Sequence, residues 1–122
     1  MRALVFRENR QVSQEQLAEP KAGQGEVVLA VKASGICHTD IEILRGNYGS
    51  SAFPLVPGHE FAGEVVEIGP GVSGVSLGDR VVVDPNLGCG NCLSCQRGRV
   101  NLCEKLGAYG VSCNGGFAER CV

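Results

Sequence analysis

Four cysteines lie within fifteen residues in the second half of this chain, in the pattern C-x2-C-x2-C-x7-C. They are Cys89, Cys92, Cys95 and Cys103. The stretch around them, residues 88–104, is otherwise polar and glycine-rich, and without hydrophobic periodicity it cannot bury a core of its own. Four thiolates at this spacing suit a tetrahedral Zn²⁺ ion with every coordination position closed. Metal binding would then supply the folding free energy that burial does not.

Two other interpretations of the four cysteines stay open. An iron–sulfur cluster also takes four cysteines, but the usual ferredoxin spacing is C-x2-C-x2-C-x3-C followed by proline. Reduced cysteines can also cluster by chance. The zinc site is favoured by Gly88, Gly90 and Gly98, because glycines let the backbone fold tightly around an ion. We therefore predict a structural zinc lobe at about residues 88–104.

The remaining cysteines and the N-terminal residues indicate a reducing compartment. The chain has seven cysteines, and this odd number argues against a closed set of disulfides. The first residues meet charge too soon to form the core of a signal peptide, and no run of 18 apolar residues is present. We therefore expect a cytoplasmic protein without membrane partners, in which Cys113 and Cys121 are spare core thiols.

Length and composition allow one domain with a single core. The 122 residues are 43% hydrophobic, and 11 basic against 13 acidic side chains give a formal net charge of −2. This near balance removes the electrostatic case for a nucleic-acid-binding or polybasic membrane-surface protein. Glycine occurs 18 times, about twice its average frequency, and the many turns this implies argue against a helical bundle.

Short strands separated by turns predict a mainly β fold. An apolar start covers residues 1–6, and strands are expected at residues 26–33, 61–68 and 80–83 and from 115 onward. In the first of these strands, Val27, Leu29 and Val31 share one face. One short helix is expected, with its N-cap at Thr39-Asp40 and Gly46 as its stop. The spacing of the strands indicates a barrel or a sandwich.

A second group of residues with metal-site chemistry lies earlier in the chain. Its members are Cys37, His38, Asp40, His59 and Glu60. Taken singly, such a cysteine or histidine is more often a packing residue than a ligand. Their sequence context changes this, because Gly58–Gly69 matches G-H-E-x2-G-x5-G. That pattern is the zinc signature of the medium-chain alcohol dehydrogenases.

Three further segments support the same resemblance. The segment Cys37–Asp40 resembles the first-ligand segment of the family, the four-cysteine lobe matches its structural zinc site, and residues 115–119 resemble its next strand. Together they cover nearly the whole chain in the right order. The resemblance implies that residues 1–122 are the N-terminal, GroES-like catalytic domain of such an enzyme. Its expected fold is a mainly β, partly open barrel with a zinc-binding lobe and short helices.

The resemblance also implies roles for individual residues. Cys37 and His59 correspond to two ligands of a catalytic zinc, and Glu60 to the adjacent carboxylate that can approach or ligate the metal. Asp40 corresponds to the carboxylate that orients His59. Thr39 corresponds to the hydroxyl that takes the proton from the substrate alcohol.

Two further residues belong to this predicted site or replace one of its members. His38 stands where the family often places a contact to the cofactor phosphates. Glu42 stands two residues after Asp40, where the family commonly has a histidine that ends a proton relay.

The family's third protein ligand and its nucleotide-binding domain fall beyond residue 122. We therefore expect the four-cysteine site to be filled and the Cys37–His59 site to be weakly held or empty.

The segment Gly69–Gly74 satisfies the dinucleotide-binding pattern G-x-G-x-x-G. That motif requires a helix after it, whereas another strand follows here and Pro70 interrupts the glycines. We therefore interpret the segment as a glycine-rich connection between strands. Tyr48, Phe53 and Tyr109 are candidates for lining a substrate cleft, although ordinary packing is the more frequent role of such residues.

These observations predict the catalytic domain of a zinc-dependent dehydrogenase of small alcohols or polyols. Zinc with an open position is a Lewis acid that lowers the pKa of a bound alcohol, so that a hydride can pass to NAD or NADP. Without a cofactor domain the chain is expected to lack turnover and to self-associate, or to form a homo-oligomer, through uncovered apolar surface. The alternative is a stand-alone, non-enzymatic zinc-binding module that acts by association.

Overall fold

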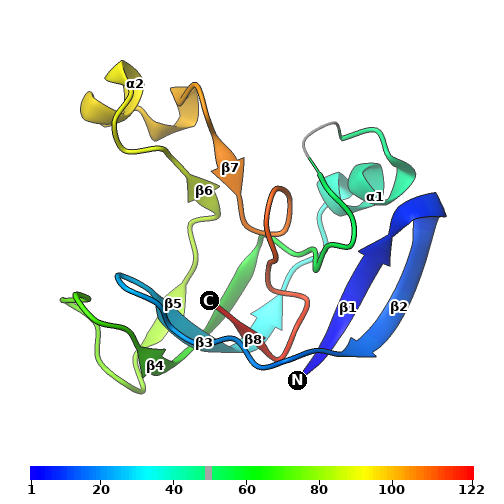
Figure 1. The fold of residues 1–122 in the computed structure, drawn as a ribbon, viewed down its shortest axis with the longest axis horizontal. Coiled ribbons are helices and arrows are strands. Elements are labelled where there is room, and N and C mark those ends of the chain that lie inside the picture. The colour runs from blue at the N-terminus through cyan, green and yellow to red at the C-terminus, as the bar shows by residue number, and fades with distance from the viewer. Residues whose placement is uncertain (49–50) are drawn as a thin grey trace.

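The computed structural model describes residues 1–48 and 51–122, and its strands form three antiparallel sheets (Figure 1). The largest sheet has four strands in the order β5-β4-β3-β8. They are β3 (Val27–Ser34), β4 (Phe61–Ile68), β5 (Arg80–Val82) and β8 (Arg120–Cys121). The two smaller sheets pair β1 (Arg2–Arg7) with β2 (Gln11–Gln16), and β6 (Asn86–Leu87) with β7 (Gly107–Ala108).

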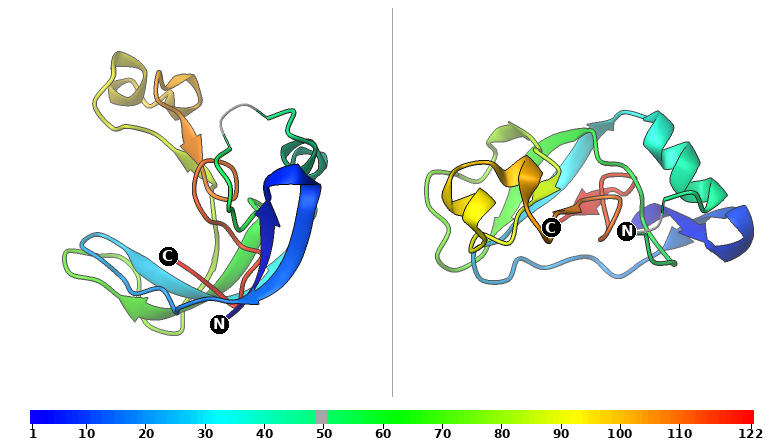
Figure 2. Two further views of the ribbon diagram at one scale, coloured as in Figure 1. Left: turned by 45° about the vertical axis from the view of Figure 1, so that its right-hand side comes forward. Right: turned by 90° about the horizontal axis from the view of Figure 1, so that it is seen from above.

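The helices are short and lie outside the sheets. They are η1 (Glu8–Arg10), α1 (His38–Arg45), α2 (Leu93–Gln96) and η2 (Val100–Leu102). Figure 2 shows α1 beside β1 and β2, while α2 sits at the end of an arm that projects from the sheet through β6 and β7. This arrangement of open sheets with few short helices confirms the predicted mainly β fold with short helices.

Strand β2 was not predicted from the sequence. Its residues, Gln11–Gln16, are mostly polar, because the strand lies at the surface and pairs along its whole length with β1. The apolar content of the hairpin is in β1, where Ala3 and Val5 are each only 3% exposed. A strand with no buried face lacks the apolar alternation on which a sequence-based prediction depends.

The helix prediction was correct at the C-terminal end of α1 and wrong at its start. Gly46 ends the helix with φ 78°, as expected of a glycine stop. The helix begins at His38 with Cys37 as its N-cap, rather than with a cap at Thr39-Asp40. The carboxylate of Asp40 caps it from inside the first turn, by accepting a hydrogen bond from the Cys37 N–H at 2.8 Å.

The last predicted strand is largely irregular, and only Arg120–Cys121 pair as β8. The residues before it still connect the β1–β2 sheet with the four-stranded sheet. The N–H of Leu4 donates to the carbonyl of Phe117, and the N–H of Val31 donates to the carbonyl of Glu119. This segment therefore lies between β1 and β3, and it divides its backbone hydrogen bonds between the two strands.

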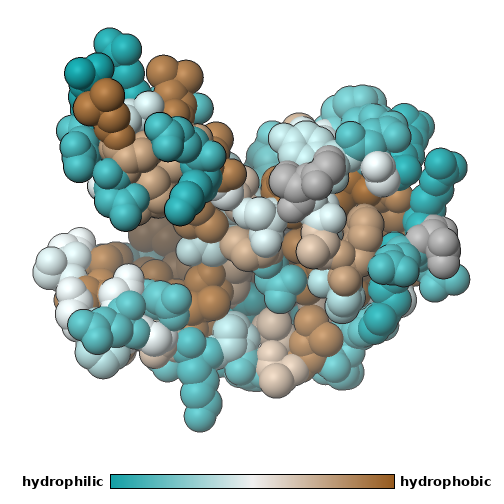
Figure 3. All heavy atoms as spheres, turned by 45° about the horizontal axis from the view of Figure 1, so that its top comes forward, coloured by the Kyte–Doolittle hydropathy of each residue, from teal (hydrophilic) through white to brown (hydrophobic). Residues whose placement is uncertain are grey.

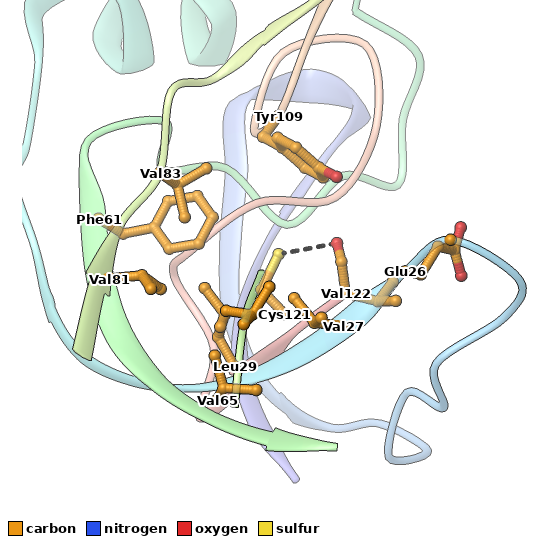
Figure 4. A pocket seen from close by; sticks show the side chains of 12 residues that line it. Glu26, Val27, Leu29, Phe61, Val65, Val81, Val83, Tyr109, Cys121 and Val122 are labelled. Carbon is orange, nitrogen blue, oxygen red and sulfur yellow. Dashed lines mark hydrogen bonds between the residues drawn. The ribbon is translucent and has the colours of Figure 1, made fainter. Parts of the chain in front are cut away.

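One hydrophobic core cluster lies on a face of the four-stranded sheet. Leu29, Phe61 and Val65 are buried there, and Val27 and Val31 pack against them, as the alternation in residues 26–33 predicted. All of these side chains except Val31 line a pocket of about 240 Å³, which Figure 4 shows from close by. The ring of Tyr109 closes one side of it and meets the Phe61 ring edge-on, with centroids 6.3 Å apart.

The glycine pattern at residues 69–74 is a connection between strands, as interpreted from the sequence. It follows the end of β4, contains Gly71 and Gly74 with φ values of 81° and 78°, and leads to β5 without a helix. Among the described residues, none of the helices reaches the length and apolarity that a bilayer crossing requires.

Candidate metal centres

The four-cysteine lobe brings its sulfur atoms to one point at the end of the projecting arm. The Sγ atoms of Cys89, Cys92, Cys95 and Cys103 all lie within 4.8 Å of one another. A tetrahedral zinc site with Zn–S bonds of about 2.3 Å has sulfur atoms about 3.8 Å apart. The donor set and its spacing therefore fit a closed structural zinc site.

Backbone N–H groups stabilise the thiolate form of two of these cysteines. Hydrogen bonds from the backbone N–H groups of Cys95 and Glu104 lower the pKa of Cys92 to about 6. The N–H of Cys89 donates to Cys103 Sγ at 3.3 Å, and this bond lowers the pKa of Cys103. The lobe thus folds its own main chain around anionic sulfur, which is the form that binds a metal.

The pKa of a third thiol in the lobe favours a bound cation. The backbone N–H of Gly90 lowers the pKa of Cys95, but burial and the neighbouring thiols of Cys92 and Cys103 together raise it to about 12. Because thiolates repel one another, four thiols this close together do not all lose their protons at neutral pH. A divalent cation removes that repulsion, so the chemistry of the cluster itself favours a bound metal.

The second centre forms where α1 and β4 begin. A ligand atom of Cys37, one of His59 and a carboxylate oxygen of Glu60 all lie within 4.8 Å of one another. Cys37 immediately precedes α1, whereas His59 and Glu60 immediately precede β4. Thiolate, imidazole and carboxylate are all ligands of zinc. The structure therefore brings together the three metal-ligand candidates that the sequence pattern singled out.

Asp40 lies behind this centre and contacts two of its residues. It is 1% exposed, and its Oδ1 is 3.4 Å from His59 Nδ1 while its Oδ2 binds the Cys37 N–H. Within the described part of the chain, both Asp40 Oδ1 and His59 Nδ1 are buried without a hydrogen-bond partner, although they face each other. With Nδ1 turned toward the carboxylate, His59 keeps Nε2 for a metal ion, so these residues fit zinc.

Thr39 and His38 extend the centre toward solvent. Thr39 Oγ1 is 3.6 Å from Cys37 Sγ, so its hydroxyl lies at the edge of the metal-ligand set. The side chain of His38 is 79% exposed, and its Nε2 is 3.6 Å from Glu42 Oε1. The predicted phosphate-contact residue is therefore free to meet a ligand from outside.

Glu42, at the position of the family's relay histidine, is held by its neighbours. Its carboxylate accepts hydrogen bonds from Asn47 Nδ2 at 2.6 Å and from Arg45 at 2.9 Å. The bond from Asn47 and then that from Arg45 lower the pKa of Glu42. Glu42 is thus an ionised side chain of α1 whose two oxygens already accept hydrogen bonds.

A stack of glycines sets the position of His59, and the sequence analysis missed this role. A Cβ at Gly110 would lie 2.5 Å from the carbonyl oxygen of Gly58, and a Cβ at Gly115 would overlap the same atom. The N–H of Gly116 also donates to that carbonyl, at 2.8 Å. The Gly-Gly pair near the chain end was the available signal, but only the fold shows that it packs on Gly58.

A groove of about 510 Å³ opens beside His59 and Glu60. Its other lining residues are mainly apolar: Ala33, Gly35, Phe61, Ala62, Val82, Val83 and Pro85. The three aromatic cleft candidates lie elsewhere. Tyr48 is exposed, Phe53 packs against the core cluster around Phe6, and Tyr109 lines the other pocket.

The spare thiols take no part in either metal centre within the described residues. Burial raises the pKa of Cys113, and burial with the neighbouring Cys113 raises the pKa of Cys121 to about 11. Both sulfur atoms lie near backbone carbonyls, at 3.8 Å from Ala108 O and 3.9 Å from Asn114 O. These features are those of unreactive, partly or fully buried thiols.

Comparison with known proteins identifies relatives of this chain. Residues 23–122 match the family described as the alcohol dehydrogenase GroES-like domain. Over 119 residues the chain is 52% identical to D-altritol 5-dehydrogenase of Agrobacterium fabrum, covering 98% of this chain and 35% of that protein. It is 45% identical over 106 residues to L-threonine 3-dehydrogenase of Pyrococcus horikoshii, covering 84% of this chain and 30% of that protein.

Solved structures agree. The structure of a zinc-binding dehydrogenase of Sinorhizobium meliloti bound to NADP matches this fold with a TM-score of 0.93 and 41% sequence identity. The match covers 98% of this chain and 35% of that chain. An alcohol dehydrogenase of Escherichia coli complexed with NADH has a TM-score of 0.92 at 38% identity, over 99% and 35%. The chain thus spans about a third of the length of the relatives it matches. The resemblance inferred from the two zinc motifs is confirmed, and the chain belongs to the alcohol dehydrogenase GroES-like domain family.

Proposed function

We propose that this chain is the zinc-binding catalytic domain of an NAD(P)-dependent alcohol or polyol dehydrogenase. The observation that carries the proposal is the convergence of Cys37, His59 and Glu60 on one point, with buried Asp40 behind them. The domain family and the relatives crystallised with NADH or NADP support the same conclusion. The four-cysteine lobe is proposed as the structural zinc site of this domain.

Each residue of the centre has a role in this proposal. Cys37 and His59 would hold a zinc ion, which the carboxylate of Glu60 could approach or ligate, and the ion would supply the Lewis acidity that lowers the pKa of a substrate hydroxyl. Asp40 keeps the proton on His59 Nδ1, so that Nε2 stays available as a ligand. Thr39, whose hydroxyl lies beside Cys37, accepts the proton of the substrate hydroxyl and passes it outward. His38, on the solvent side, contacts the phosphates of the cofactor.

The groove beside His59 and Glu60 is the proposed substrate site. Its apolar wall, with Val82 and Val83, can cover the carbon chain of a substrate while the hydroxyl group faces the metal centre. Polyols are the favoured class, because D-altritol 5-dehydrogenase and a D-arabinitol dehydrogenase of Uromyces fabae are both among the relatives. L-threonine, an amino acid with a secondary alcohol, is the next class to test.

The proposal includes dependence on a nucleotide-binding domain. Within the described residues the only G-x-G-x-x-G segment connects two strands, so a nicotinamide cofactor has no phosphate loop here. Large apolar side chains are exposed at Ile36, Leu77 and Val82, at 77%, 66% and 83%. Figure 3 shows further apolar surface on the lobe and in the hollow beneath it. We therefore expect the 122-residue chain alone to lack turnover and to self-associate.

The test is the reduction of NAD⁺ and NADP⁺ by the intact protein that carries this domain together with a nucleotide-binding domain. The substrate panel contains pentitols, hexitols, simple primary and secondary alcohols, and L-threonine. We expect turnover with at least one polyol, loss of turnover in Cys37→Ser, and retention in the matched control Cys113→Ser. A zinc-loaded protein that reduces neither cofactor with any substrate contradicts the proposal and favours the non-enzymatic module.

A further inference from the structure

Gly35 lies between β3 and α1 and is joined to Glu60 at the second metal centre. The backbone N–H of Gly35 donates to the carbonyl oxygen of Glu60 at 2.7 Å. A Cβ at Gly35 would lie 2.7 Å from Glu60 Oε2 and 3.4 Å from Glu60 Cβ. Cβ atoms in proteins essentially never come within 3.0 Å of another heavy atom in this way. The carboxylate of Glu60 therefore occupies the space that any side chain at position 35 would need.

The place of this carboxylate matters because it belongs to the metal-ligand set. A carboxylate oxygen of Glu60 lies within 4.8 Å of the ligand atoms of Cys37 and His59. Catalytic zinc sites usually have three protein ligands and one open position. Cys37 and His59 supply two ligand atoms of this group, and the carboxylate of Glu60 supplies the other.

A side chain at position 35 would disturb the carboxylate and little else. Gly35 is not among the glycines with positive φ, so its backbone can accommodate alanine. Gly35 and Glu60 are both exposed and both line the groove. An added methyl group would thus push a mobile carboxylate group aside, rather than open or overfill the core.

We propose that Gly35 is a positioning residue, whose missing side chain lets the carboxylate of Glu60 lie against Cys37 and His59 as an additional metal ligand. The proposal rests on the proposed function, since it assumes a metal ion at that pair. Gly35 would not touch the metal, and its contribution would act entirely through Glu60.

The chain offers a matched control at another glycine. A Cβ at Gly23 would also lie 2.7 Å from a carboxylate oxygen, Oε2 of Glu26, and Gly23 also lacks a positive φ. Both residues are exposed, and neither belongs to a metal centre within the described residues. Gly23→Ala therefore reproduces the same substitution and the same close contact away from the metal ligands.

The experiment measures Co²⁺ binding to the full protein after the four-cysteine site has been filled with zinc. Visible absorption of Co²⁺ reports the ligand set, and titration gives the affinity. We expect about tenfold weaker binding and an altered spectrum in Gly35→Ala, as is typical when a group that orients a ligand is disturbed. Gly23→Ala should match the wild type in both, and thermal unfolding should be alike in all three.

A double-mutant cycle with Glu60→Ala tests whether the effect passes through the carboxylate. We expect Gly35→Ala to weaken Co²⁺ binding in the wild-type background and to add nothing when Glu60 is absent. Equal weakening in both backgrounds, or none in the wild type, would overturn the positioning role and leave the proposed function standing. A wild-type protein that takes up no Co²⁺ at Cys37 would overturn both.

Discussion

Replacing Asp40 with asparagine tests how the second metal centre is organised. Asp40 is almost fully buried, and each of its oxygens faces a different residue of the centre, the N–H of Cys37 and the Nδ1 of His59. Asparagine has the same shape but can accept with only one of these atoms. If the amide oxygen keeps the bond to Cys37, its NH₂ group faces His59 Nδ1. The imidazole must then carry its proton on Nε2, which removes Nε2 as a metal ligand.

The expected magnitudes separate this effect from simple destabilisation. Loss of a partner that orients a metal-bound histidine typically costs 10- to 100-fold in metal affinity, or about 1.4–2.8 kcal/mol of binding free energy. Asp40→Asn keeps the cap of α1, so its free energy of unfolding without metal should change less than that of Asp40→Ala. The alanine variant loses a hydrogen bond to a charged, buried acceptor and should lose about 1.5–3 kcal/mol.

The assay combines competition for Zn²⁺ at the Cys37 site with urea unfolding of the metal-free protein. The matched control is Asp79→Asn, because Asp79 Oδ2 also accepts the N–H of the residue three positions before it, Ser76, at 2.8 Å. That control should leave zinc binding unchanged. If Asp40→Asn binds zinc as tightly as the wild type, the carboxylate does not select the tautomer of His59 and the reasoning fails.

Three further changes test other parts of the molecule. Cys103→Ser should release the zinc of the lobe and speed amide exchange there, while β3 and β4 stay protected, as metal analysis and hydrogen exchange would show. Gly115→Ala should destabilise the protein by about 1–3 kcal/mol in urea unfolding, because its Cβ would overlap the Gly58 carbonyl. Hydrogen bonding from Arg7 lowers the pKa of Glu15 from 4.5 to about 2. Glu15 thus stabilises the fold above about pH 4.5, an effect lost as pH falls toward 2, and Glu15→Gln should flatten that part of the stability curve.

Much of the site could be predicted because its information is local in the sequence. Four cysteines within fifteen residues define a metal lobe by spacing alone, and their sulfur atoms do come together. The segments that begin at Cys37 and at Gly58 each carry a recognisable pattern, although only the fold brings them to one point. Glu42 was recognisable as a departure from the family, but its bonds to Asn47 and Arg45 follow from the geometry of α1.

The features that escaped prediction depend on contacts across the chain. Strand β2 has no buried face of its own, so its existence follows only from pairing with β1. The cap of α1 was misplaced because a carboxylate at the third helical position, Asp40, satisfies the N–H of Cys37 in place of a residue before it. The packing of Gly110 and Gly115 on Gly58 joins segments more than fifty residues apart.

The glycines of the zinc signature explain why one pattern predicts both the site and the fold. Besides Gly58, the pattern contains Gly63 within β4, where a Cβ would lie 2.6 Å from the carbonyl oxygen of Ala30 in β3. It ends at Gly69, where a Cβ would overlap the carbonyl oxygen of Gly23. Each of the three glycines thus lies where another part of the chain passes too close for a side chain, and at Gly58 this is Phe117, whose ring a Cβ would overlap. Because the contact at Gly63 lets β4 pair closely with β3, the pattern that places His59 at the metal centre also favours the sheet that carries it.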